Sequence, residues 1–251
     1  MLITSPRTVQ VAIAVIYCLL AAGIVFGYAA LKPVLIQEGV YREYCTEEEL
    51  EEGVRTCFDQ EIRLNLMFTV AAVGTNVAAL PIGMILDNYG PRVCGLAGSV
   101  FLAIGAALFA FARDVPFDGF IPGYLFLALG GAFFLISSFQ LSNTFPKHSG
   151  AILALLTGAF DSSSALFLVY RMLYQWSNET LHPKKFFLVY LAVPAFIFVA
   201  QLFIMPHQSY KTVGELVQQV ADTDSIYDDQ MDENTALLRD CLLYTSDAAD
   251  E

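Results

Sequence analysis

The chain has 251 residues, of which 56% are hydrophobic and 15% charged, and its formal net charge is −12. A soluble domain is roughly 45–50% apolar and about 25% charged, so most of this surface is expected to face lipid. The acidic charge argues against nucleic acid as a partner, because phosphate binding needs a surplus of Lys and Arg. Most acids fall in two blocks, Glu38–Glu61 and Glu215–Asp240, which are predicted to face water.

Six apolar stretches are long enough to cross a membrane, which takes about 20 predominantly apolar residues. We predict an all-α membrane protein whose residues 1–205 form a six-span bundle. The predicted spans are 9–31, 64–86, 93–112, 120–142, 150–170 and 186–205. The first stretch exceeds the roughly 7–15 apolar residues of a cleavable signal, so we expect a retained anchor with its N-terminus in the cytosol. That orientation places five cations in the cytosol and eight outside, which conflicts with the positive-inside rule.

The loop after the first span lies outside the cytosol in this orientation and contains Cys45 and Cys57. These residues either form a disulfide, which an oxidising compartment permits, or remain two thiols. Cys18 and Cys94 lie within predicted spans and are interpreted as small packing residues. Asn178 begins an Asn-Glu-Thr sequon and is a candidate glycosylation site.

The strongest local motif joins the second and third predicted spans and contains Gly83, Asp87, Gly90 and Arg92. Gly83 is expected to allow a neighbouring helix to approach closely. Asp87, at a helix end, is placed to pair with a cation or a helix N-terminus. The alternative is an ordinary tight turn. The spacing resembles the signature loop of the major facilitator superfamily, in which this loop is cytosolic and acts as a conformational latch. Asn88 replaces the family's usual basic residue, which implies a weaker latch.

Several short patches are similar to solute carrier family 43, most closely to a fungal branch. They are Phe26–Leu31, Glu38–Cys45, Leu64–Thr69, Leu80–Gly83 and Ser138–Asn143 with Phe145. This resemblance implies facilitated passage of large neutral amino acids, or of nucleobases in one branch. It also implies that the chain is the N-terminal half of a major-facilitator fold, built from two three-helix repeats.

Asp161 is the one acid within the predicted spans, where a carboxylate costs about 2.5–3.5 kcal/mol at the bilayer centre. Helical spacing places Thr157, Asp161 and Ser164 on one face, and Gln140 with Asn143 gives the fourth span a polar strip. Facing strips predict a cavity for a polar solute, in which Asp161 contacts an ammonium group or transfers a proton. The alternative is a structural carboxylate bonded to nearby serines or to an arginine.

Tyr28 and Asn76 lie within the first two spans, and each is either a pocket residue or a packing residue that bonds between helices. The three histidines lie at span edges on alternating sides, so no metal site is expected. No cofactor motif or paired catalytic groups were found in the sequence, which favours a protein that is not an enzyme.

Residues 206–240 are predicted to be an acidic cytosolic linker that is mostly disordered. Within it, Glu233, Leu237 and Leu238 resemble an acidic dileucine sorting signal, which implies a vacuolar or lysosomal membrane; the plasma membrane is the alternative. Residues 241–251 resemble a translated sequencing adaptor, so the native sequence is expected only to about Asp240. A genuine tail is the other interpretation.

Together these features predict a multi-pass transporter that moves an amino acid or similar small solute by alternating access. Its expected partners are the lipid bilayer, the solute and a C-terminal six-span half that this chain lacks, because such carriers hold the solute between two halves. The alternative is a membrane scaffold that keeps the fold and does not transport.

Overall fold

The computed structural model describes residues 6–51, 54–145, 148–177 and 180–206. All of the regular elements in these ranges are helices, which confirms the all-α prediction for them. The longer helices are α1 (Pro6–Tyr17), α2 (Tyr28–Gln37), α4 (Phe58–Ala110), α5 (Phe120–Phe139), α6 (Ser149–Ser163), α7 (Ala165–Trp176) and α9 (Ala192–Phe203). The shorter ones are η1 (Cys18–Ala22), η2 (Ile24–Gly27), η3 (Arg42–Tyr44), α3 (Glu47–Glu51), η4 (Gln140–Thr144) and α8 (Pro183–Tyr190). Asn178, the sorting motif, most of the predicted linker and the tail at 241–251 lie outside the described residues.

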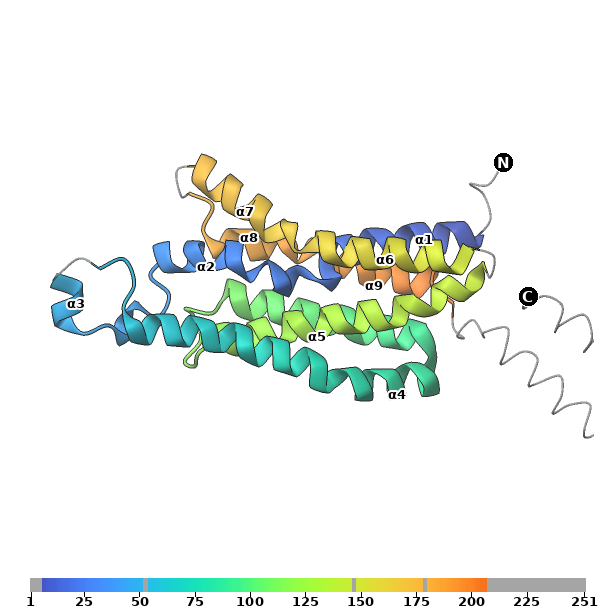
Figure 1. The fold of residues 1–251 in the computed structure, drawn as a ribbon, viewed down its shortest axis with the longest axis horizontal. Coiled ribbons are helices and arrows are strands. Elements are labelled where there is room, and N and C mark those ends of the chain that lie inside the picture. Colours follow the sequence, from blue (N-terminus) through green and yellow to red (C-terminus); the bar gives the residue numbers. More distant parts are fainter. Residues whose placement is uncertain (1–5, 52–53, 146–147, 178–179, 207–251) are drawn as a thin grey trace, which may run out of the picture. The chain divides into compact units, whose positions relative to one another are not determined.

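Helix α4 contains both the second and the third predicted spans and reverses direction at Gly90 (Figure 1). Gly90 has φ 80° and ψ 173°, a conformation that glycine adopts without the steric cost that a Cβ would bring. Pro91 follows at the start of the next helical stretch, where its missing N–H has no partner to lose. We call residues 58–89 the first arm of α4 and residues 91–110 the second arm.

Length and apolarity identify four membrane-crossing helices among the described residues, or five when the bent pair Arg7–Ala22 and Ile24–Gln37 counts as one span. The predicted six spans are therefore not confirmed by this criterion. The difference arises because a single non-helical residue separates the two arms of α4, so its 53 residues count once. Helices also extend past predicted span ends, since α2 continues to Gln37 and α7 to Trp176.

Helix α5 packs against both arms of α4 through small residues. A Cβ on Gly130 would lie 2.9 Å from the carbonyl oxygen of Gly98, and one on Gly105 would lie 2.8 Å from that of Gly123. Such backbone-to-backbone contact is typical of helix packing in membranes, where small residues replace the hydrophobic effect as the basis of close association. The two elements therefore form the tightest part of the bundle.

The surface of the bundle is apolar where the spans would meet lipid. Val77, Leu80 and Phe203 are 70%, 76% and 79% exposed. Water would be a poor solvent for such a continuous apolar surface, whereas helices that satisfy their own backbone are suited to lipid. The apolar helices thus favour a multi-pass membrane protein.

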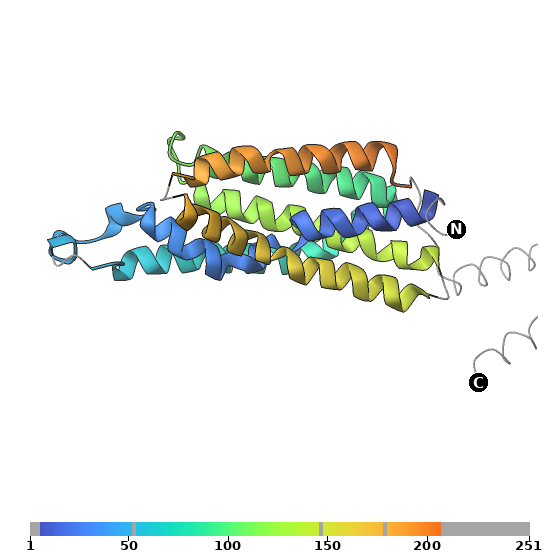
Figure 2. The ribbon, with the colours of Figure 1, turned by 90° about the horizontal axis from the view of Figure 1, so that it is seen from above.

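The elements define two ends of the bundle, as both views show (Figures 1 and 2). The Gly90 end contains the start of α1, the Gly90 turn and the end of α9. The disulfide end contains α3, where the structure joins Cys45 to Cys57 by a disulfide with a Cα–Cα distance of 5.6 Å. Tyr41 also lies at this end and donates to Asp118 Oδ2 at 2.7 Å. Burial, and then this hydrogen bond, raises the pKa of Tyr41, so the phenol stays protonated.

Candidate functional site

The first apolar segment is a broken helix. Predicted as one span over residues 9–31, it instead passes from α1 through the π-helical turn η1, Gly23 and the 3₁₀ turn η2 before α2 begins. The two halves are bent by 41°. The bent pair can still count as one span, but its break was not predicted, because apolar content does not report the local helix type. π and 3₁₀ turns inside a helix often mark functional sites or hinges.

Side chains from three neighbouring helices form hydrogen bonds with the backbone around the break. The Gly23 N–H donates to Ser163 Oγ at 2.7 Å, Tyr124 Oη donates to the Val25 carbonyl at 2.7 Å, and Tyr190 Oη donates to the Leu20 carbonyl at 2.9 Å. Irregular backbone at membrane depth persists only where protein groups replace its hydrogen bonds. The break is thus built into the bundle.

The glycines of the broken first segment touch the helix opposite. Helices α6 and α7 meet at Ser164, which keeps helical φ −59° and ψ −27°, so residues 149–176 form one membrane-crossing helix. A Cβ on Gly23 would lie 2.3 Å from the Phe160 carbonyl oxygen, and one on Gly27 would lie 2.2 Å from the Ser164 carbonyl oxygen. We call Gly23, Gly27, Phe160, Ser163 and Ser164 the junction. The broken helix can change its tilt at this point, because 3₁₀ and π turns inside a helix often mark hinges.

Asp161 lies directly beside the junction. Its side chain is exposed, and among the described residues no ion pair or hydrogen bond to its carboxylate occurs. The Ser164 hydroxyl donates at 2.7 Å to the Asp161 backbone carbonyl, not to the carboxylate. The structure therefore does not show the alternative of a structural carboxylate bonded to serines. Phe160, the residue before Asp161, packs against half-exposed Phe26. Their rings meet edge to face, with centroids 5.6 Å apart.

The residues of the two predicted polar strips lie in different environments. Thr157 is exposed on α6, and its hydroxyl donates to the Leu153 carbonyl at 2.8 Å. Gln140 lies in η4 at the Gly90 end and is only 9% exposed. Its Nε2 donates to the Ser137 carbonyl at 3.1 Å, while its Oε1 is buried without a partner among the described residues. Asn143, also in η4, is partly exposed.

Tyr28 and Asn76 use their polar atoms on helix backbone. Tyr28 is buried, donates to the Leu64 carbonyl at 2.6 Å and stacks on Phe68 with centroids 5.3 Å apart. Asn76 is exposed and donates to the Ala72 carbonyl at 2.8 Å. Tyr28 therefore joins α2 to the first arm of α4, as the packing interpretation requires, whereas Asn76 bonds within its own helix.

The Gly90 turn presents its predicted latch residues in different environments. Asp87 is exposed at the end of the first arm. No atom of the described chain lies within 4 Å of a Cβ placed on Gly83, so the expected close approach of a helix does not occur there. Arg92 donates through Nε and Nη2 to the Met205 carbonyl at 3.0 and 2.7 Å. Arg92 therefore links the second arm of α4 to the residues that follow α9.

A buried polar cluster that sequence reasoning missed lies between the junction and the Gly90 end. The hydroxyls of Tyr17 and Ser138 lie 2.8 Å apart, and Cys18 Sγ lies 3.4 Å from the same serine. The carboxamide of buried Gln201 lies against Gly95. A Cβ added to Gly95 would come within 2.5 Å of three atoms of this carboxamide. A lone glutamine within the last predicted span was the signal that could have revealed this cluster.

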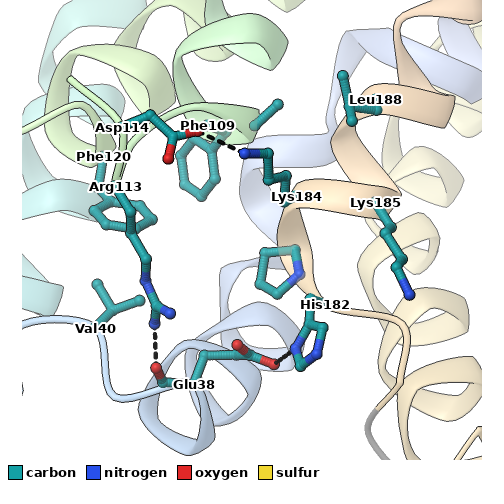
Figure 3. Close-up of a pocket in the computed structure, with 12 residues that line it drawn as sticks. Glu38, Val40, Phe109, Arg113, Asp114, Phe120, His182, Lys184, Lys185 and Leu188 are labelled. Atoms are coloured by element: carbon teal, nitrogen blue, oxygen red, sulfur yellow. Dashed lines mark hydrogen bonds and ion pairs between the residues drawn. The ribbon is translucent and has the colours of Figure 1, made fainter.

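A cavity of about 520 Å³ opens at the disulfide end (Figure 3). Glu38 organises it: its carboxylate accepts from Tyr174 Oη at 2.9 Å and lies 2.7 Å from His182 Nδ1, while its backbone carbonyl accepts from Arg113. Across the cavity, Lys184 Nζ lies 2.6 Å from an Asp114 carboxylate oxygen (Figure 3). Most of these polar groups are bound to one another, so we interpret them as contacts that hold the helix ends together around the cavity.

No family model matches the chain. It is 52% identical over 220 residues to Protein FMP42 of Saccharomyces cerevisiae, an alignment that covers 86% of this chain and 43% of that protein. It is 34% identical over 163 residues to Equilibrative nucleobase transporter 1 of Bos taurus, covering 63% and 33%. It is 30% identical over 174 residues to Large neutral amino acids transporter small subunit 3 of Mus musculus, covering 64% and 30%. The chain thus spans less than half the length of these relatives.

The chain is related to membrane transporters. The relatives named by an activity move nucleobases or amino acids, and the described helices are apolar enough to cross a membrane. These similarities confirm the prediction that the chain is not an enzyme and support a membrane transporter. The solute and the transport mechanism require further argument.

Proposed function

We propose that the chain is the N-terminal half of a facilitator-type carrier of the solute carrier family 43 kind, which moves an amino acid or similar small solute by alternating access. One observation carries this proposal: the broken first helix meets the α6–α7 helix at the junction, and the Gly23 N–H is bound by Ser163 Oγ at 2.7 Å. In transporters, discontinuous helices near the bilayer midplane form solute sites and allow the surrounding halves to move.

The junction suits a moving part because its backbone hydrogen bonds are supplied by side chains. Tyr124 and Tyr190 donate to the carbonyls of Val25 and Leu20 at 2.7 and 2.9 Å. A hydroxyl can follow a small tilt of its acceptor, whereas a regular helix would have to break several backbone bonds to bend as far. The glycine contacts then act as the pivot.

The solute site is assigned to the exposed surface around the junction. Asp161 supplies a carboxylate that can bind an ammonium group, and half-exposed Phe26, packed against the preceding residue Phe160, supplies an aromatic surface. An intramembrane carboxylate without a partner is costly, which favours a functional role over a structural one. Thr157, Ser164, Asn76 and the amides of η4 remain candidate contacts.

The same proposal assigns the two arms of α4 to separate spans, which gives six spans in total. It places the Gly90 turn in the cytosol, where Asp87 and Arg92 would act as the latch between conformations. Six further spans in a longer protein would complete the carrier, which would reside in a vacuolar, lysosomal or plasma membrane.

Uptake of radiolabelled large neutral amino acids and nucleobases by cells expressing the longest available gene product tests the proposal. We expect at least one solute to accumulate above vector controls. Asp161→Asn should reduce that uptake at least tenfold at equal membrane abundance, since it removes the proposed ammonium partner. Glu47→Gln, on the exposed helix α3, should have no effect. Absence of uptake across the panel would favour the scaffold, and unchanged uptake by Asp161→Asn would refute the assigned site.

A further inference from the structure

A second cavity, of about 540 Å³, lies at the disulfide end between α2, α7 and the loop that the Cys45–Cys57 disulfide closes. Four basic side chains line it, and the described residues of its lining include no acid. They are Lys32 from α2, Arg42 from η3, Arg55 from the loop and Arg171 from α7. We call this cavity the basic pocket. Cations from four separate segments thus converge on one space, although like charges repel one another.

The arginines of the basic pocket lack the partners that neighbouring cations have. Lys32 binds Glu61 at 2.9 Å and Asn65 at 3.0 Å. Outside the pocket, Lys184 binds Asp114 at 2.6 Å, and Arg63 lies 4.3 Å from the ring centre of Tyr44. By contrast, Arg42, Arg55 and Arg171 have no ion pair or hydrogen-bond acceptor for their guanidinium groups within the described residues. Three fork-shaped donors are therefore available to a ligand.

The disulfide determines where two of these arginines lie. Cys45 and Cys57 are bonded with their Cα atoms 5.6 Å apart, so the segments that carry Arg42 and Arg55 cannot separate. Holding binding groups in place before a ligand arrives reduces the entropy lost on binding. Guanidinium groups match carboxylate and phosphate oxygens in paired hydrogen bonds. The pocket is therefore organised for an oxyanion.

We propose that the basic pocket binds a phosphate or other oxyanion group. This site goes beyond the proposed transport and does not depend on it, because binding can be measured on a chain that moves no solute. The pocket also has an apolar wall formed by Ala29, Pro33 and Ile36, next to which the glycerol and acyl groups of a lipid could lie. The phosphate therefore has two possible sources, an anionic lipid headgroup or a soluble anion.

Thermal unfolding of the 251-residue chain in lipid nanodiscs distinguishes these sources. One set of discs contains phosphatidylcholine alone and receives inorganic phosphate at constant ionic strength. The other set contains phosphatidic acid and receives no phosphate. Binding to the folded state raises the unfolding midpoint by mass action, and we expect a rise of about 5 °C at saturation in at least one set.

Arg42→Gln, Arg55→Gln and Arg171→Gln should each weaken the response about tenfold in ligand concentration. Lys185→Gln, which removes one charge at the same end but outside the basic pocket, should respond as the unmodified chain does. If an arginine variant fails to fold, Arg171→Lys keeps the charge, loses the fork and should show an intermediate loss. A response only to phosphatidic acid identifies a headgroup, and a response to phosphate identifies a soluble anion. No response in either set, or equal responses from all variants including Lys185→Gln, would overturn the proposal.

Discussion

Replacing Gly23 with alanine tests whether the junction depends on backbone contact. The added Cβ would lie 2.3 Å from the Phe160 carbonyl oxygen, whereas ordinary contact begins at 3.4 Å. The two helices would have to separate by about 1 Å, and such overpacking costs about 1–3 kcal/mol. Separation would also stretch the 2.7 Å hydrogen bond from the Gly23 N–H to Ser163 Oγ. An unsatisfied buried donor costs about 1–3 kcal/mol more.

The expected total loss in the free energy of unfolding is therefore about 2–6 kcal/mol, or a midpoint about 4–24 °C lower for a chain of this size. Thermal unfolding of purified protein in detergent, followed by tyrosine fluorescence, measures this shift. Gly158→Ala is the matched control, because Gly158 lies in α6 and no atom of the described residues lies within 4 Å of a Cβ placed there. Alanine is preferred to glycine within a helix by about 0.5–1 kcal/mol, so the control should be neutral or slightly stabilising. Equal midpoints for the two variants would refute the junction as a close contact.

The other predictions use the same measurement. Ser163→Ala should lower the free energy of unfolding by about 1–3 kcal/mol because it removes the acceptor of the Gly23 N–H; a variant as stable as the unmodified chain would show that another group takes its place. Replacing Cys45 and Cys57 with serine should lower the free energy of unfolding by about 2–4 kcal/mol, since the unfolded chain gains entropy without the cross-link. Reductant should then lower the unfolding midpoint of the unmodified chain and leave that of the serine variant unchanged. Glu38→Ala should cost about 1–3 kcal/mol through its lost hydrogen bonds, whereas Asp114→Asn, whose ion pair is half-exposed, should change stability by about 1 kcal/mol or less.

Local sequence signals were sufficient for the helical fold class and for the candidate Cys45–Cys57 pair. They were insufficient for the break at Gly23, because a Gly-x-x-x-Gly spacing is equally compatible with a straight helix that packs closely. Whether Gly23 and Gly27 touch a neighbour depends on where Ser163 and Ser164 lie in space. That information is absent from either segment alone.

The cavity expected between polar strips stays a prediction for a related reason. Helical spacing correctly places Thr157 and Asp161 on one face of α6, but it does not determine toward which helix that face turns. The structure turns it outward from the described bundle. Gln140 was assigned to the opposing strip from spacing alone, yet the helix changes to the 3₁₀ turn η4 at this residue, so the spacing no longer applies.

The excess of cations on the side predicted to be outside has a physical explanation in the folded chain. The positive-inside rule describes how loops cross a membrane during insertion, whereas a cation can also be retained for what it binds after folding. At the disulfide end, Lys184 binds Asp114, Arg113 binds the Glu38 carbonyl, and Lys32 binds Glu61. Arg42, Arg55 and Arg171 converge on the basic pocket. Lys184, Arg113 and Lys32 are thus held by contacts within the fold, and the proposed ligand would hold the three arginines, so the number of cations at this end is a poor guide to orientation.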